Sequence, residues 1–104
     1  MTLLVSATII VMIKSFKDKE TNRIFSGEIS RKLPFDIQRT AKRKLLMINA
    51  IDNIFDLSIP PSNHLEKLKG DRWDQYSIRI NQQWRICFHW QNKDAYNVEI
   101  TDYH

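Results

Sequence analysis

The sequence contains few residues that favour sharp turns or covalent cross-links. Its 104 residues include two glycines and three prolines, which leaves little room for long flexible linkers. We therefore expect one domain, of a size that buries roughly 60–65% of the surface exposed by the unfolded chain. The single cysteine, Cys87, excludes an internal disulfide and is typical of a reducing cytoplasm. Because it lies within a predicted strand, a buried apolar role is favoured over a nucleophilic one.

Metal-ligand motifs and membrane spans are also lacking. No group of cysteine and histidine residues has zinc-ligand spacing, so we predict no metal and no other cofactor. The uncharged stretch at residues 1–13 is shorter than the roughly 20 residues of a membrane helix, and no basic segment precedes it, as one would in a secretory signal. We expect no membrane association. A second methionine, Met12, starts a more ordinary sequence, which predicts an N-terminal extension at residues 1–11 and a functional domain at residues 12–104.

Basic residues are present in modest excess. The chain has 16 lysine and arginine residues against 12 acidic ones, a formal net charge of +4. This balance favours an anionic partner, with nucleic acid first and an acidic protein second. A basic surface that contacts only solvent is an equally good interpretation.

Helical periodicity dominates the first half of the domain. Residues 12–16 alternate apolar and polar side chains and predict a short strand, and Asp18 and Gly27 then mark the start and end of a brief helix over residues 18–25. Pro34 suits the first turn of a second helix. Apolar residues recur in that helix at Ile37, Ala41, Leu45, Ile48, Ile51 and Phe55. This spacing gives one apolar face and a basic outer face.

The second half switches to an alternation of period two, which predicts strands. Three such runs lie at residues 76–81, 84–90 and 96–101, after a charged loop that turns at Gly70. We expect an antiparallel meander with one buried face. The helices must cover that face, because neither layer can bury its apolar surface alone.

The register of the first hairpin follows from the same alternation. Apolar side chains stay on one face only if Ile78 lies opposite Ile86 and Tyr76 lies opposite Phe88. Arg79 then faces Arg85 on the open side, where a bound anion would relieve the repulsion or the two side chains splay apart. The basic residues expected on or beside this open face, together with one histidine, are Lys67, Lys69, Arg72, Arg79, Arg85 and His89.

A family resemblance rests on two stretches of the sequence. They are LEKLKGDRWDQYSIRINQQWRICFHW and the C-terminal AYNVEITDYH. Together they closely resemble the HigB-like (host inhibition of growth) toxins of the RelE/ParE superfamily, from about Met12 to His104. The resemblance implies a RelE-like α+β fold with a short N-terminal strand and two helices packed on one face of an antiparallel sheet. It also implies a cytoplasmic toxin that cleaves messenger RNA on the ribosome without a metal.

The resemblance assigns roles to individual residues. In the implied reaction the ribose 2′-hydroxyl attacks the adjacent phosphate, which requires a base, an acid and cations. The residues that match the family's catalytic positions are Lys69, Arg85, Asp102, Tyr103 and His104, with Lys67, Arg72 and Arg79 expected to bind RNA. The implied partners are a cognate helix-turn-helix (HigA-like) antitoxin, the ribosome with its message, and operator DNA through the antitoxin alone.

Two features depart from the family pattern. Some members have a histidine where this chain has Glu66, and His64 is a possible substitute. Strict alternation also places Tyr103 on the Arg85 face and Asp102 and His104 on the other. Two alternative functions stay open: a non-enzymatic inhibitor such as a gyrase poison, and a weak toxin that acts mainly with its antitoxin at an operator.

Overall fold

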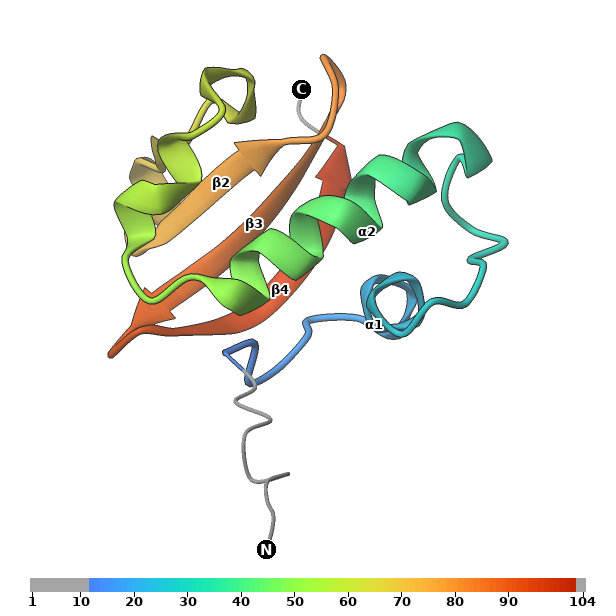
Figure 1. The fold of residues 1–104 in the computed structure, drawn as a ribbon, viewed down its shortest axis with the longest axis horizontal. Coiled ribbons are helices and arrows are strands. Elements are labelled where there is room, and N and C mark those ends of the chain that lie inside the picture. Colours follow the sequence, from blue (N-terminus) through green and yellow to red (C-terminus); the bar gives the residue numbers. More distant parts are fainter. Residues whose placement is uncertain (1–11, 103–104) are drawn as a thin grey trace, which may run out of the picture.

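The computed structural model describes residues 12–102, so the predicted extension at residues 1–11 lies outside them. Four strands form one antiparallel sheet in the order β1-β2-β3-β4. Their bounds are Glu66–Lys67 for β1, Gln75–Arg79 for β2, Trp84–Gln91 for β3 and Asp94–Asp102 for β4. Helix α2 (Phe35–Ala50) crosses one face of the sheet, and α1 (Lys19–Phe25) lies beside α2 and contacts the edge strand β4 (Figure 1). The predicted α+β fold is confirmed.

The segment expected to form a short first strand lies beside β4 without forming a continuous ladder. It makes two isolated parallel bridges, Ile13 with Ala95 and Phe16 with Val98. Between these two positions of β4, Asn97 has a φ of 53°, which breaks the regular spacing of backbone groups that a longer ladder needs. The side chain of Asn49 in α2 accepts hydrogen bonds from the backbone N–H groups of residues 12 and 13, both at 3.1 Å.

The short helix α1 has the ends that the sequence predicts. The side chain of Asp18 accepts a hydrogen bond from the backbone N–H of Thr21 at 2.7 Å and so caps the first turn. At the other end Gly27 has a φ of 89°, and the N–H groups of Gly27 and Glu28 donate to the carbonyls of Ile24 and Arg23. This pair of bonds is a Schellman motif, which requires the left-handed conformation that glycine adopts most easily.

The second helix begins after Pro34, as predicted, but ends earlier than the apolar spacing indicated. Residue Ile51 is extended, with ψ of 151°. The side chain of Asn53 then caps a separate 3-10 helix, η2 (Ile54–Ser58), by accepting from the N–H of Phe55 at 3.0 Å. The prediction that Phe55 extends the apolar face of α2 is therefore wrong, and its side chain is 67% exposed. Local capping by asparagine competes with helix continuation here.

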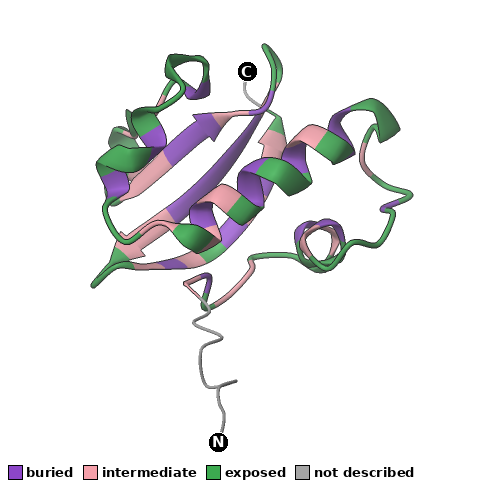
Figure 2. Cartoon of the chain, viewed as in Figure 1, coloured by how far each residue is buried: buried purple, intermediate pink, exposed green. Residues whose placement is uncertain are grey.

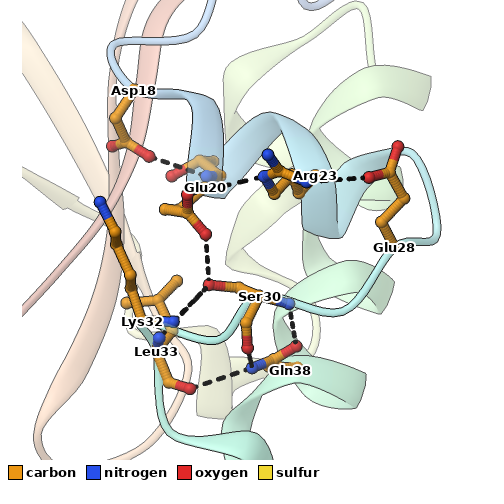
Figure 3. Close-up of polar contacts among 9 residues, drawn as sticks. Asp18, Glu20, Arg23, Glu28, Ser30, Lys32, Leu33 and Gln38 are labelled. Atoms are coloured by element: carbon orange, nitrogen blue, oxygen red, sulfur yellow. Dashed lines mark hydrogen bonds and ion pairs between the residues drawn. The ribbon is translucent and has the colours of Figure 1, made fainter.

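Buried polar contacts fix the connection between the two helices (Figure 3). Ser30 donates from its hydroxyl to the carboxylate of Glu20 at 2.6 Å. The amide of Gln38 accepts from the N–H of Ser30 at 3.0 Å and donates to the carbonyls of Ser30 and Leu33 at 2.8 and 3.0 Å. Because each of these buried groups has a partner, the loop can turn back against α2 without a desolvation penalty.

The core lies between the inner face of α2 and one face of the sheet (Figure 2). Its fully buried members come from both layers and include Leu45, Ile48, Ile78, Ile86 and Phe88. Truncating one of them, such as Leu45 to alanine, would cost about 2–5 kcal/mol. All of this apolar packing is on the helix side, which leaves the opposite face of the sheet for polar side chains.

The predicted register is confirmed. Tyr76 pairs with Phe88, Ile78 with Ile86, and Arg79 with Arg85. The predicted turn at Gly70 is also present, as the 3-10 helix η4 (Gly70–Arg72). The expectation of three strands was incomplete, because part of the charged loop forms the edge strand β1. Two residues are too few to show an alternating pattern.

Candidate functional site on the open face of the sheet

Cross-strand pairs identify the side chains that share the open face, because directly paired residues point to the same side. Ser77 pairs with Cys87, Arg79 with Arg85, and Gln75 with His89. In β4 the open-face positions include Glu99, which pairs with Cys87, and Thr101, which pairs with Arg85. The expectation that Arg79, Arg85 and His89 belong to one face is therefore confirmed.

The placement expected for Lys67 is wrong. Lys67 pairs with Tyr76, a core-facing residue, and its Nζ lies 5.5 Å from the centroid of the Tyr76 ring. Both side chains line a groove of about 500 Å³ beside the segment that includes Phe55 and Pro61. A one-residue step along a strand reverses the face, and β1 was not predicted as a strand.

Arg85 lies within the open face rather than extending from it. The residue is 2% exposed. Its Nε donates to the hydroxyl of Ser77 at 2.8 Å and its Nη2 to the carbonyl of His64 at 2.7 Å, while Nη2 also lies 3.3 Å from the carboxylate of Glu66. The guanidinium thus crosses β2 toward β1 instead of splaying into solvent beside Arg79. Glu66, which departs from the family pattern, has a defined electrostatic partner in Arg85.

The C-terminal end of β4 adjoins the turn between β2 and β3. Asp102 pairs with Trp84, and its Oδ2 accepts a hydrogen bond from the amide of Gln83 at 3.1 Å. Since Thr101 shares the face of Arg85, Asp102 begins on the opposite face, as the alternation predicted. Tyr103 and His104 lie outside the described residues, so their predicted roles stay predictions.

At the other end of the face, one carboxylate holds two cations. Oε2 of Glu99 lies 3.1 Å from Nη1 of Arg72 and 3.4 Å from Nζ of Lys17, and Arg72 also donates to the amide oxygen of Gln75 at 3.1 Å. The expected RNA-binding residue Arg72 is therefore on the open side, and it ties η4 to β4. Lys69, directly before η4, is exposed.

A histidine–carboxylate pair lies next to this cluster. Nδ1 of His89 is 3.1 Å from Oδ2 of Asp74. His89 lines a hollow of about 330 Å³ together with Lys17, Gln75, Asn97 and Glu99. The sequence placed His89 on this face without assigning it a role, and it gave no role to Asp74. The register of β2 with β3 was the available signal, because it pairs His89 with Gln75, the residue directly after Asp74.

Three of the predicted catalytic residues, Lys69, Arg85 and Asp102, lie within residues 12–102, and they are spread along the length of the sheet. Lys69 precedes β2, near the pair of Gln75 and His89, whereas Asp102 lies beyond the pair of Arg79 and Arg85. The two ends are separated by roughly 13 Å of strand β2. A substrate that contacts both must be extended along the sheet.

Lys44 is a buried lysine that the sequence reasoning missed. It is 4% exposed, and its Nζ donates to the backbone carbonyl of Arg79 at 2.6 Å. Burial lowers the pKa of this ammonium group from its ordinary value of 10.5, with further lowering from the charges of Arg43, Arg79 and Arg85. The signal was present in the spacing, since Lys44 falls on the same helical face as Ala41 and Ile48.

Cys87 is buried in the middle of the sheet, as predicted. It is 3% exposed. Burial raises the pKa of its thiol above the ordinary value of 9.0, and the nearby cations, Arg72 first, offset only part of this effect. A thiol in this state is a weak nucleophile, which agrees with a packing role.

Residues 12–102 contain neither a cluster of metal-ligating side chains nor a membrane-spanning helix. No three side chains of the His, Cys, Asp and Glu types gather closely enough there to hold a metal ion. Neither helix of this described part has both the length and the apolar composition needed to cross a bilayer.

Fold and site together define a small α+β protein whose sheet has one face against the helices and an open face that carries Arg79, Arg85 and His89. Residues 14–104 match the family model described as RelE-like toxin of type II toxin-antitoxin system HigB. The chain belongs to this HigB-like family, whose members are toxins paired with an antitoxin.

Individual relatives agree with this assignment. An uncharacterized protein of Haemophilus influenzae is 38% identical over 86 residues, which is 82% of this chain and 85% of the relative. Toxin HigB-1 of Vibrio cholerae is 36% identical over 86% of this chain and 95% of its own length. Endoribonuclease HigB of Proteus vulgaris is 37% identical over 89% of this chain and 100% of its own length.

Proposed function

We propose that this toxin is a ribosome-dependent endoribonuclease that cleaves messenger RNA by acid/base transphosphorylation. The observation that carries the proposal is the open face of the sheet, which presents cationic side chains at both ends and the length for an extended strand. The relative from Proteus vulgaris, named an endoribonuclease and matched over its full length, supports the same activity.

The proposed reaction is a proton-coupled exchange at one phosphate. A base removes the proton of the ribose 2′-hydroxyl, the 2′-oxygen bonds to the adjacent phosphorus, and the 5′-oxygen leaves with a proton from an acid. The products are a 2′,3′-cyclic phosphate and a 5′-hydroxyl. We propose His104 as the acid or base, because imidazole exchanges protons near neutral pH. Asp102 orients a neighbouring group, and Tyr103 stacks on a base.

The cations of the open face have different roles in this proposal. Arg85 is held by the oxygens of Ser77, His64 and Glu66, so it supplies a fixed positive charge beneath the reacting phosphate. A preorganised charge stabilises developing negative charge without reorganising during the reaction. Lys69 joins Arg85 in this role, and Arg72 and Arg79 contact neighbouring phosphates.

The proposed partners follow from the family. We expect a cytoplasmic toxin held inactive by a helix-turn-helix (HigA-like) antitoxin, with operator DNA bound through that antitoxin. The ribosome supplies the message in an extended, unpaired form, which suits a site spread along a strand.

Cleavage of a message on purified translating ribosomes tests the proposal. Primer extension should reveal cuts within the translated region, and the same message without ribosomes should stay intact. An intact message on ribosomes, with the protein shown to be folded by circular dichroism, would contradict the activity. Trapped gyrase–DNA complexes in its place would point to the gyrase-poison alternative.

A further inference from the structure

The hollow beside His89 is a polar site to which neither the family description nor the names of the relatives assign a role. Its lining consists of Lys17, Gln75, His89, Asn97 and Glu99, around a volume of about 330 Å³. This volume is at the lower end of the range for small-ligand sites, which fits a group no larger than a planar base. The hollow lies on the same face as Arg85, four residues along β3.

The charges around the hollow do not favour a phosphate. The ammonium of Lys17 and the guanidinium of Arg72 are both within 3.4 Å of the Glu99 carboxylate, and His89 faces the carboxylate of Asp74. Two carboxylates therefore oppose two cations, and a phosphate entering here would meet as many negative groups as positive ones. Phosphate recognition normally needs a clear positive excess.

The lining groups instead match the edge of a nucleobase. Gln75 and Asn97 carry amides, which offer both donors and acceptors, and His89 carries an imidazole. Glu99 contacts both cations through Oε2, and within residues 12–102 its Oε1 has no hydrogen bond or ion pair. Paired donor and acceptor groups of this kind distinguish bases through the groups on their edges.

An exposed aromatic residue lies two positions before Gln75, which lines the hollow. Trp73 is 66% exposed and directly precedes Asp74, the partner of His89. The turn that carries Trp73 is anchored to β4 through the contact of Arg72 with Glu99 at 3.1 Å, and the Trp73 N–H donates to the Gly70 carbonyl at 3.2 Å. Exposed tryptophan on a fixed support is a suitable platform for stacking an unpaired base.

We propose that this hollow binds one unpaired nucleobase of the RNA substrate, with Trp73 stacking on an adjacent base, so that it sets a base preference at one position of the message. The identity of the ligand as RNA rests on the proposed function. The hollow does not include Arg85 or Asp102, so base selection and phosphodiester cleavage use different side chains.

Asn97 offers a clean way to test the hollow. Its φ is 53°, a value that glycine accepts without strain, so Asn97→Gly removes the amide while keeping the backbone. Asn92 has a φ of 52° in the turn between β3 and β4 and does not line the hollow. Asn92→Gly is therefore a matched control for the backbone effect. His89→Ala and Trp73→Ala complete the set, with exposed Phe55→Ala as the control for loss of a large aromatic side chain.

The first measurement is equilibrium binding of the single-stranded hexaribonucleotides rA6, rC6 and rU6, followed by anisotropy of a labelled oligonucleotide. The unaltered protein should prefer one of them by on the order of tenfold. Asn97→Gly and His89→Ala should reduce that ratio toward one, Trp73→Ala should weaken all three, and both controls should match the unaltered protein. Equal affinities for the three probes in the unaltered protein, or an unchanged ratio in Asn97→Gly and His89→Ala, would overturn the inference.

The second measurement maps cut positions in a ribosome-bound message library. The base preference at one position should broaden in Asn97→Gly and stay in Asn92→Gly. If the unaltered protein cuts but the preference is the same in every variant, the base site is wrong and the proposed function stands. If the unaltered protein does not cut, the proposed function fails, and the oligonucleotide ratios still decide whether the hollow binds a base.

Discussion

The two ends of the open face use opposite charge arrangements. At one end, the cation of Arg85 is surrounded by oxygen atoms from Ser77, His64 and Glu66. At the other end, the anion of Glu99 is surrounded by the cations of Lys17 and Arg72. The first arrangement fixes a buried guanidinium beside a half-exposed carboxylate, and a donor group held in place in this way suits the stabilisation of a phosphorane-like transition state. The second is close to neutral and rich in hydrogen-bonding groups, which suits recognition of a base.

The largest expected effect concerns the catalytic end. His104→Ala should lower the single-turnover rate of cleavage on ribosomes by on the order of 10²–10⁴-fold, because it removes a proton-transfer group. Asn92→Gly, in the turn between β3 and β4 and outside the predicted catalytic residues, is the control and should retain cleavage. A His104→Ala protein that cuts at the original rate would show that the proton is transferred elsewhere.

The next effect concerns how much the contacts of Arg85 stabilise the folded protein. Arg85→Ala leaves the buried hydroxyl of Ser77 and the carbonyl of His64 without the donor that each now has, so the free energy of unfolding should fall by about 1–3 kcal/mol. Glu66→Gln should change it by less than about 1 kcal/mol, because Glu66 is half exposed and its amide replacement still accepts a hydrogen bond. Urea unfolding of the three proteins measures both values. Equal losses of unfolding free energy in Arg85→Ala and Glu66→Gln would mean that the Ser77 hydroxyl and the His64 carbonyl contribute little to holding Arg85.

The burial of Lys44, which donates to the Arg79 carbonyl from the helix side, should make the free energy of unfolding depend on pH. Burial lowers its pKa below 10.5 in the folded protein, so between the lowered value and 10.5 the unfolded chain binds more protons than the folded one. Stability then rises with pH in that interval. The stability of the unaltered protein relative to Lys44→Met should therefore increase as the pH is raised toward 10.5.

Lys42→Met removes a charge from an exposed position of the same helix and serves as the control for Lys44. Urea unfolding at several pH values between 7 and 10 gives the comparison for both variants. A difference for Lys44→Met that stays constant, or falls, as the pH rises would contradict the effect of burial on its ammonium group.

The smallest effect belongs to the base-binding end. Glu99→Gln weakens the attraction of Lys17 and Arg72 and should lower the unfolding free energy by up to about 1 kcal/mol, with a smaller loss at high salt. Glu28→Gln, which disrupts an exposed pair with Arg23 at 3.3 Å, should cost a few tenths of a kcal/mol. A loss in Glu99→Gln as large as that in Arg85→Ala would remove the distinction between the two ends.

Much of the fold was readable because its signals are periodic. Alternation over whole strands gave the register of β2 with β3, down to Arg79 opposite Arg85, and the Asp18 and Gly27 signals gave both ends of α1. The signals failed where they were short or local. The two residues of β1 carry no period, so Lys67 was placed on the wrong face, and the Asn53 cap ended the helical pattern before Phe55.

The site was predictable as a surface but not as a set of contacts. The resemblance and the alternation together named Arg85, but its burial depends on the carbonyl of His64, which lies 21 residues away in the sequence. The contacts of His89 with Asp74 and of Glu99 with Lys17 likewise join separate parts of the chain. Such contacts arise from tertiary packing, which leaves no pattern in a single sequence.

The central claim is that the open face positions an RNA 2′-hydroxyl for attack on its own phosphate. A ribosome-bound message with one 2′-deoxy nucleotide at a mapped cut position tests this directly, because the nucleophile is absent there while the base and phosphates are unchanged. We predict that cutting at that position is lost while the neighbouring cut positions persist. Continued cutting at the 2′-deoxy position would contradict the account.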